Sequence, residues 1–298
     1  RETWDDALST LKKYISGELT STKIDESKFY GIVETQEAIE WLKAAKASNS
    51  TKIAVDTETT GLYPRDGYIL GISMCVDPET AVYINSDCVD DEVVDLMQSI
   101  FNEKQVIMHN AKFDLAMLEY HFNFEFPTID DTMLMSYMLN EVPGNHGLKG
   151  LAIKHTPYGD YEKPMYEFMD DYCRRNGLLK GDFTWDMIPF DLIQVYAAMD
   201  ACVTYRIYEV FEEELNKDPQ IRRVYKNLLI PAMRFLKDIQ ETGVPFDRKR
   251  LEISQNLMED DIQIAIDKLE KHQEVRSFQE FQGKDFNPNS TLQLRKLL

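Results

Sequence analysis

Apolar positions along this 298-residue chain follow two different periods. Spacings of three and four residues predict helices over residues 35–47, 91–101 and 111–121. Short apolar runs predict strands over residues 52–56, 68–76, 81–84, 105–110 and 126–129. The turn DPET joins the second and third of these runs and predicts a hairpin. Strands and helices that alternate around one mixed sheet indicate an α/β fold.

The second half of the chain is predicted to be mainly helical. Asp131 and Asp191 each precede an apolar periodic segment, and we expect each to cap a helix. Residues 144–190 are rich in Gly, Pro and Tyr and have weak periodicity, which indicates short helices and loops. Further helices are predicted over residues 220–241 and 248–272.

These patterns predict three regions. Residues 1–30 are polar around one short amphipathic stretch and are expected to be an extension or linker. Residues 31–216 are expected to form the α/β domain, and residues 217–298 a helical region. The chain begins with Arg1, and its helical pattern breaks off at the last residue, so we expect a piece of a longer protein.

Composition excludes several classes of protein. Hydrophobic residues make up 43% of the chain, and no apolar run approaches the roughly 20 residues that cross a bilayer. The four cysteines form no CxxC pair, which argues against a zinc knuckle or a disulfide framework. We therefore expect reduced thiols in a cytosolic compartment and no secretion.

The net charge of −19 constrains any function that involves nucleic acid. Residues 1–216 carry a balance of −21 and residues 217–298 one of +2. Phosphate contacts usually come from Lys and Arg. If residues 1–216 bind only the end of a nucleic-acid strand, and do so through metal ions, the metals neutralise the phosphate and a basic surface is not required. The alternative is that the acidity only aids solubility.

Four carboxylates in three separate segments are the candidate chemistry. Asp56 and Glu58 in VDTET are two apart at the end of a predicted strand, so they point to the same side while Thr57 turns away. Asp114 in HNAKFD begins a predicted helix. Tyr196 and Asp200 are four apart, on one face of a predicted helix. Together they could hold divalent metals that cut phosphodiesters.

Each segment has a structural explanation when it is taken alone. An isolated DxE motif is more often an acidic turn, Asp114 alone would be a surface acid, and Tyr196 alone would pack an amphipathic face. Asn110 could meet a phosphate or cap a helix. The functional interpretation depends on the three segments occurring together.

In this order the segments resemble the proofreading 3′–5′ exonuclease domain of family A DNA polymerases. The resemblance is carried by VDTETTGL, HNAKFD, DTMLMSYMLN and YAAMDA. It continues in LLIPAMRFLKDIQETGVPFDRKRL and FNPNSTLQLRKLL, which look like the opening helices of that family's thumb. It covers the chain from about residue 31 to the end.

The resemblance implies a ribonuclease H-like (DnaQ-like) fold and two divalent metal ions, Mg²⁺ or Mn²⁺. The implied metal ligands are Asp56, Glu58, Asp114 and Asp200, and Tyr196 would position the attacking water. The implied contacts to the 3′ nucleotide are Thr59, Leu62, Asn110 and Phe113. The implied partners are a single-stranded or frayed DNA 3′ end, a duplex primer–template bound through the thumb, and the palm and fingers of a full-length polymerase.

Two other functions remain open at this level. An exoribonuclease of the ribonuclease D type shares the tyrosine arrangement, although GVPFD followed by FNPNS matches the polymerase thumb better. A nuclease-shaped scaffold without activity is the other alternative, because a fold alone does not establish function.

Overall fold

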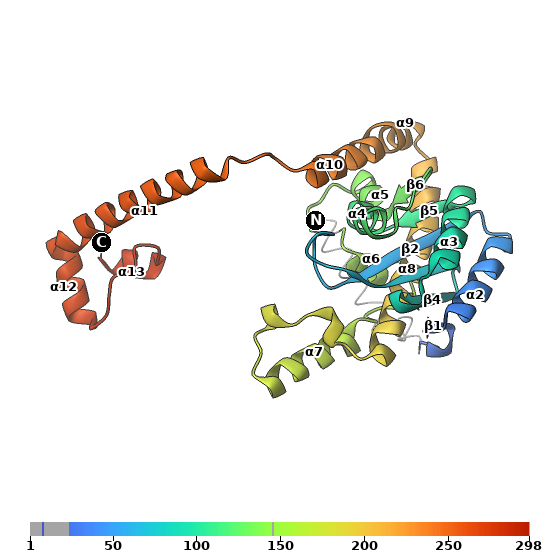
Figure 1. The fold of residues 1–298 in the computed structure, drawn as a ribbon, viewed down its shortest axis with the longest axis horizontal. Coiled ribbons are helices and arrows are strands. Elements are labelled where there is room, and N and C mark those ends of the chain that lie inside the picture. The colour runs from blue at the N-terminus through green and yellow to red at the C-terminus, as the bar shows by residue number, and fades with distance from the viewer. Residues whose placement is uncertain (1–7, 9–23, 145, 298) are drawn as a thin grey trace. The chain divides into compact units, whose positions relative to one another are not determined.

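The computed structural model describes residues 8, 24–144 and 146–297 (Figure 1). Contacts divide the chain into two compact units, one that ends at Glu241 and one that comprises Thr242–Leu298. The amphipathic stretch that we expected within residues 1–23 lies, apart from residue 8, outside the described residues. In the part of the chain that the structure describes, no helix is both long and apolar enough to span a bilayer.

The first unit is built on a mixed sheet. Strand order is β1-β4-β3-β2-β5-β6. β2 pairs antiparallel with β3 and parallel with β5, while β3 and β4 form the predicted hairpin. The α/β fold class is therefore confirmed. The six strands are β1 (Phe29–Ile32), β2 (Lys52–Thr59), β3 (Ile69–Asp77), β4 (Thr80–Asn85), β5 (Gln105–Met108) and β6 (Ile129–Asp131).

Two strands differ from the predicted pattern. β1, which pairs parallel with β4, was not predicted, because it has only four residues and includes Gly31. β6 begins at Ile129, where the predicted strand ended. Phe126 lies before it and packs against Phe101, with ring centroids 5.0 Å apart. Aromatic packing of a loop, and not strand pairing, thus explains why Phe126 is buried.

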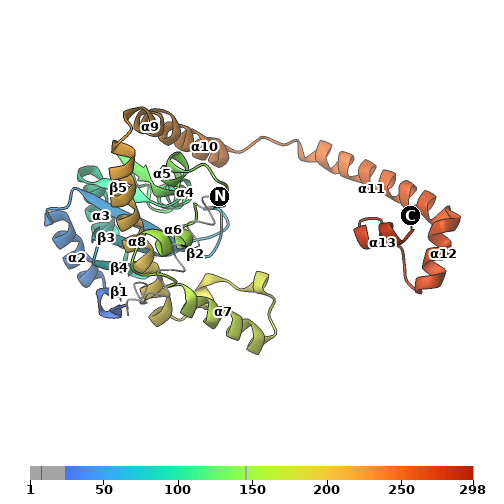
Figure 2. The ribbon, with the colours of Figure 1, turned by 180° about the vertical axis from the view of Figure 1, so that it is seen from behind.

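Helices cover both faces of this sheet. α8 packs against β1 to β5 on one face, and Figure 2 shows it along that side. α2 and α3 pack against each other. The helices of this unit are α2 (Thr35–Ala47), α3 (Asp91–Glu103), α4 (Ala111–Phe122), α5 (Thr132–Leu139), α6 (Leu148–His155), α7 (Lys163–Asn176), α8 (Phe190–Asn216), α9 (Pro219–Val224) and α10 (Ile230–Thr242).

One of the two predicted caps is confirmed and one is wrong. Asp131 accepts hydrogen bonds from the backbone N–H of Met133 at 2.8 Å and of Leu134 at 3.2 Å, which caps α5. α8 begins at Phe190, so Asp191 lies inside its first turn and does not cap it. Pro189 takes the position before the helix, where its φ of −58° and lack of an N–H cost no helical hydrogen bond.

The chain beyond α8 returns to the edge of the sheet. A π-helical segment, Tyr225–Leu229, joins α9 to α10. The buried Tyr225 hydroxyl donates to Asp130 Oδ1 at 2.8 Å, and Lys226 lies 2.5 Å from the same oxygen. On α10, Lys237 pairs with Glu119 of α4. These contacts explain why the first unit extends to Glu241, well past residue 216.

The described residues of the second unit form helices joined by loops, with no strand. It contains α11 (Arg248–Lys271), α12 (Gln273–Gln282) and α13 (Thr291–Leu297). The predicted helix over residues 248–272 is confirmed. Val275 and Phe278 are buried on α12, and Phe278 meets Phe286 edge-on with ring centroids 5.6 Å apart. α11 contributes no buried residue to this small core.

Candidate functional site

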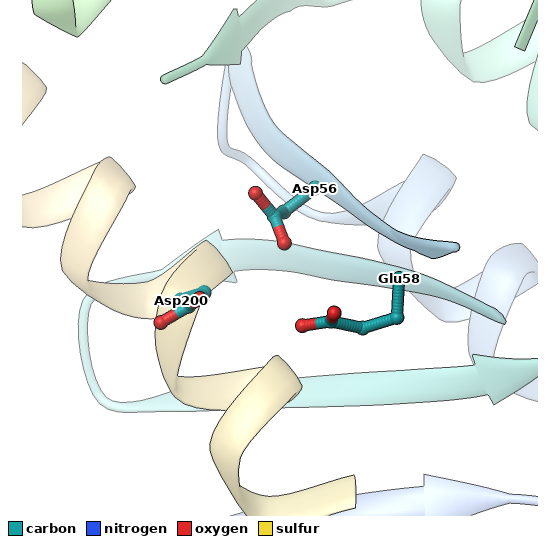
Figure 3. A group of neighbouring side chains, drawn as sticks. All are labelled: Asp56, Glu58 and Asp200. Atoms are coloured by element: carbon teal, nitrogen blue, oxygen red, sulfur yellow. The ribbon is translucent and has the colours of Figure 1, made fainter. Parts of the chain in front are cut away.

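Three of the predicted carboxylates meet where β2 faces α8. One oxygen from each of Asp56, Glu58 and Asp200 lies within 4.8 Å of the others. Figure 3 shows Asp56 and Glu58 extending from one strand toward Asp200 on the helix. Glu58 and Asp200 are buried, with 6% and 5% of their surface exposed, and Asp56 is partly buried. Residues far apart in the sequence are therefore brought together as the sequence predicted.

The strand sets the direction of the two acids on β2. Alternate residues of a strand face the same side, so Asp56 and Glu58 both point toward α8. The pairing of β2 with β3 shifts register between Glu58 and Thr59, which is the irregularity of a β-bulge. Bulges re-aim side chains and end strand pairing next to functional sites. The strand therefore presents both acids immediately before its regular pairing ends.

Asp114 lies close to this group but outside it. Its Oδ1 accepts from the Thr57 backbone N–H at 3.0 Å and from the Thr57 hydroxyl at 2.7 Å. Thr57 points away from Asp56 and Glu58, as predicted, and its hydroxyl meets Asp114 of α4, while the charge of Asp114 still raises the pKa of Asp56. Asp114 is 2% exposed. The other three acids thus form the compact group, and Asp114 borders it at the strand.

Asp131 fixes the start of the helix that carries Asp114. It accepts from the backbone N–H groups of Asn110 at 3.1 Å and Ala111 at 2.9 Å, at the first turn of α4. Asn110 adopts a left-handed conformation, with φ 62°, which Asn tolerates better than most residues. A carboxylate at a helix N-terminus is stabilising, so this contact anchors α4.

Burial and nearby negative charges disfavour ionisation of Asp56, Glu58 and Asp114. Burial raises the pKa of Asp56 well above its usual value, and the charges of Asp114, Asp200 and Glu58 raise it further. Burial, followed by the Asp200 charge, does the same to the pKa of Glu58. Burial raises the pKa of Asp114 to about 7, although its hydrogen bonds from Thr57 act in the opposite direction. Such a group strongly favours a bound cation.

Tyr196 lies one helical turn before Asp200, as its spacing predicted. Its ring packs near the rings of Trp185 and Tyr161, with centroids 5.6 Å and 6.1 Å away. Burial and then the Asp200 charge raise the pKa of the Tyr196 phenol well above its usual value, so it stays protonated at neutral pH. Among the described residues its hydroxyl has no hydrogen-bond partner, and it is therefore available to a water molecule.

Two residues at this site were not predicted from the sequence. The Lys149 ammonium and the Tyr161 hydroxyl both bond to Oδ1 of Asp200. Both residues come from the stretch 144–190, whose weak periodicity hid them. The apolar spacing of Leu148, Leu151 and Ala152 is a signal for the short helix α6 that carries Lys149. No comparable signal marks Tyr161, which lies in a loop.

The four residues expected to contact a nucleotide lie on two elements. Thr59 ends β2 and is buried, and its hydroxyl donates to the Gly61 carbonyl at 2.9 Å. Leu62 follows in the loop and is 77% exposed. Asn110 is exposed at the start of α4, where Phe113 is partly buried against the core. The role of these four residues in substrate binding stays a prediction.

The loop that carries Leu62 is narrow at its base. The Thr60 N–H donates to the Tyr68 carbonyl at 3.0 Å, and a Cβ added at Gly67 would lie 2.7 Å from the Gly61 nitrogen. Only glycine permits this close approach of the two backbones. The loop therefore presents Leu62 to solvent from a fixed base.

Comparison with known proteins shows similarity to DNA polymerases along most of the chain. The chain is 38% identical over 275 residues to the DNA polymerase of Escherichia phage T5, a match that covers 90% of this chain and 32% of that protein. It is 25% identical over 311 residues to DNA polymerase I of Pseudomonas aeruginosa, which covers 99% of this chain and 32% of that protein. The chain thus spans about a third of the length of these relatives.

Solved structures share the fold. The POL domain of Pol1 from M. smegmatis, in complex with DNA primer-template and dNTP, matches with a TM-score of 0.58 and 16% identity over 90% of this chain and 40% of that chain. Escherichia coli RNase D, an exoribonuclease, matches with a TM-score of 0.51 and 15% identity over 71% of this chain and 51% of that chain. These matches confirm the expected ribonuclease H-like fold.

A match to a protein-family model shows to which family the chain belongs. The model described as 3′–5′ exonuclease, from the family A DNA polymerases, matches residues 30–216, which include Asp56, Glu58, Asp114, Tyr196 and Asp200. This match spans more than half of the chain. The chain therefore belongs to the 3′–5′ exonuclease family of the family A DNA polymerases.

Proposed function

We propose that this chain is a metal-dependent 3′–5′ exodeoxyribonuclease that removes nucleotides from DNA 3′ ends. The observation that carries the proposal is the convergence of Asp56, Glu58 and Asp200, with one oxygen of each within 4.8 Å of the others. Membership in the exonuclease family supports the same reaction. The reaction is hydrolysis of the terminal phosphodiester, which releases a 5′-mononucleotide.

The donor set fits a hard divalent cation. All of its ligand atoms are carboxylate oxygens, with no His or Cys in the group, which suits Mg²⁺ or Mn²⁺. We propose two ions, held by Asp56, Glu58, Asp114 and Asp200. Bound there, the cations would lower the pKa of a water molecule and stabilise the departing 3′ oxygen.

We assign the positioning of the attacking water and of the terminal nucleotide to side chains of this chain. Tyr196 is protonated and its hydroxyl has no partner among the described residues, so we assign it the orientation of the attacking water and not its deprotonation. We assign the grip on the terminal nucleotide to Thr59, Leu62, Asn110 and Phe113. The exposed Leu62 offers an apolar surface to an unstacked base, a contact that tolerates any sequence.

The proposed partners follow from the relatives. The substrate is a single-stranded or frayed DNA 3′ end, and residues 217–298, as the start of a thumb, would reach duplex primer–template. The palm and fingers would belong to the full-length protein, whose activity in replication is proofreading. The relatives are bacterial and phage proteins, so we propose the cytoplasm of a bacterial or virus-infected cell as the compartment.

A labelled-primer assay tests the proposal. A 5′-labelled DNA strand with a mispaired 3′ end is incubated with Mg²⁺ or Mn²⁺, with and without EDTA. We expect a ladder of shortened products that EDTA abolishes. Asp56→Ala and Asp200→Ala should each lose activity by about 10²–10³-fold or more, because each removes part of the electrostatic stabilisation. Asp191→Ala, at an exposed position on the same helix as Asp200, should keep the full rate.

Three outcomes would contradict the proposal in whole or in part. A strong preference for RNA over DNA of matched sequence would favour an exoribonuclease of the ribonuclease D type. The absence of any metal-dependent ladder from a folded chain would favour an inactive scaffold. Near-normal rates in both Ala variants would refute the metal assignment while leaving the activity in place.

A further inference from the structure

Lys149 is the cation nearest to the proposed metal ligands among the described residues. It projects from α6, and its side chain is 25% exposed. Its ammonium bonds to Oδ1 of Asp200 and lies 2.9 Å from the Tyr161 hydroxyl. It also lies 4.2 Å from the ring centroid of Tyr196 and 4.6 Å from that of Tyr161. One side chain thus contacts both members of the Tyr196–Asp200 motif and the aromatic residue beside them.

These contacts fix the orientation of the Asp200 carboxylate. Oδ1 accepts from both Lys149 and Tyr161, and a carboxylate oxygen has about two lone-pair sites. Both lone-pair sites of Oδ1 are therefore occupied by hydrogen bonds from Lys149 and Tyr161. Oδ2 receives no hydrogen bond from the described residues. The pair of contacts leaves Oδ2 as the oxygen of Asp200 that is free to bind a metal.

The same two residues hold the ring of Tyr196. The Lys149 ammonium lies against its face at a distance typical of a cation–π contact, which is worth more when it is partly removed from water. Tyr161 and Trp185 bring their own rings against it. The phenol ring is thus held by three contacts while its hydroxyl has no hydrogen-bond partner among the described residues, which is the arrangement that a water-orienting group requires.

Simple neutralisation of a buried acid does not account for this arrangement. One ammonium faces three carboxylates, those of Asp56, Glu58 and Asp200, so it can balance the charge of only one of them and leaves the other two to a divalent cation. A counter-ion also does not require Tyr161, whose hydroxyl bonds to the same oxygen as the lysine. The double contact on one oxygen is the feature that calls for a positioning role.

We propose that Lys149 and Tyr161 are positioning residues of the nuclease reaction, which together hold Oδ1 of Asp200 so that Oδ2 would be left to bind a metal, and hold the Tyr196 ring so that its hydroxyl would be left to orient the attacking water. The reaction they serve is the proposed function above. Neither residue contacts the reacting atoms. Both act through Asp200 and Tyr196.

Substitution of Lys149 in the full chain tests the inference. Lys149→Met keeps the length of the side chain and removes its charge and donors. We expect kcat to fall by about tenfold or more with KM for the DNA nearly unchanged, because misplacement by about 1 Å costs up to about 10²-fold in rate. The matched control is Lys154→Met on the same helix, where the side chain is exposed, and it should stay within about twofold of wild type.

Metal binding gives a readout that does not depend on activity. Calorimetric titration with Mn²⁺ should show that Lys149→Met binds the ion as tightly as wild type or more tightly, because a positive charge has left the site. A residue that only supported the fold of the ligand set would lower Mn²⁺ affinity and rate together. Tyr161→Phe should lower kcat by a smaller factor, since it keeps the ring and loses only the hydroxyl.

The outcomes separate this inference from the proposed function. Wild-type activity with unchanged kcat in Lys149→Met would overturn the inference alone, as would a parallel loss of Mn²⁺ affinity and rate. If Lys149→Met does not fold, Lys149→Arg and Tyr161→Phe decide, and full activity in both would overturn it. A wild-type chain that cleaves no DNA with either metal would overturn the proposed function and this inference with it.

Discussion

The two units of the molecule differ in how they treat apolar side chains. The unit that ends at Glu241 buries large residues completely, such as Phe101 and Tyr83 with 0% and 1% exposed. The unit from Thr242 onward leaves Leu257 and Met258 at 61% and 66% exposed on α11. A helix such as α11, with 24 residues, gains most of its stability from packing of an apolar face. The first unit therefore has a core of its own, and the second has an apolar face that its own residues do not cover.

The sharpest test of this comparison measures the stability of chains that are shortened near the end of the first unit. A chain that stops at Glu241 should unfold in urea at nearly the same concentration as the full chain. A chain that stops at Asn216 loses Tyr225 and Lys226, which leaves Asp130 buried without two of its partners. We expect it to lose at least about 5 kcal/mol, because breaking one buried pair alone costs about 3–5 kcal/mol. Equal stability of the two shortened chains would place the boundary near residue 216.

A pair of substitutions tests the difference in packing. Phe101→Ala in the first unit should cost about 3–5 kcal/mol of unfolding free energy, because it leaves a cavity among packed aromatic rings. Leu257→Ala in the second unit should cost less than about 0.5 kcal/mol, as is usual at an exposed position. Urea unfolding monitored by circular dichroism measures both. A large effect of Leu257→Ala would show that its side chain packs against something in solution.

The pH dependence of stability tests the interior of the first unit. Burial, and then the charge of Lys149, lower the pKa of His109 from its usual value of 6.5 to about 4. Above pH 6.5 both the folded and unfolded chains hold this histidine neutral. As pH falls from 6.5 toward 4, only the unfolded chain gains the proton, so folding loses up to about 3 kcal/mol.

Unfolding of wild type and His109→Gln between pH 4 and 7.5 measures this contribution as the difference between the two curves. His272→Gln, an exposed position in the second unit, is the control variant. Parallel curves for wild type and His109→Gln would show that His109 takes up protons equally in both states.

The predicted effect of Glu58→Gln on stability has the opposite sign, because it stabilises the fold. Burial and the charge of Asp200 raise the pKa of Glu58, so at neutral pH the folded state resists its ionisation more than the unfolded state does. In EDTA, Glu58→Gln should raise the unfolding free energy by about 0.5–2 kcal/mol, the gain common when a strained functional group is neutralised. Thermal melts in EDTA measure it. A lower melting temperature would show that the Glu58 charge stabilises the fold.

The sequence predicted the site residues best where they lie on a strand or a helix with a regular period. Asp56 and Glu58 on a strand, and Tyr196 and Asp200 on a helix, could be placed because a period of two or of 3.6 fixes which residues share a face. Asp131 could be identified as a cap from its position before an apolar run. Their meeting in space could be inferred only from the family resemblance, since no local pattern states which strand faces which helix.

The contacts that were missed come from irregular backbone or from long range. Tyr161 reaches Asp200 from a loop that has no period to read. β1 is short and joins the sheet by pairing with β4, far along the chain. The hold of Tyr225 on Asp130 joins residues separated by 95 positions. Tertiary pairing of this kind overrides local propensity and leaves no local signature.

Asp131 serves two helices with one carboxylate, because it accepts from Asn110 and Ala111 at the start of α4 and from Met133 and Leu134 at the start of α5. The first turns of the two helices therefore form and loosen together. Since α4 also carries Asp114, local fraying at α5 would be transmitted to a carboxylate of the proposed catalytic set. Asp131, which is not one of the proposed metal ligands, thus anchors both helices, and the position of Asp114 depends on it.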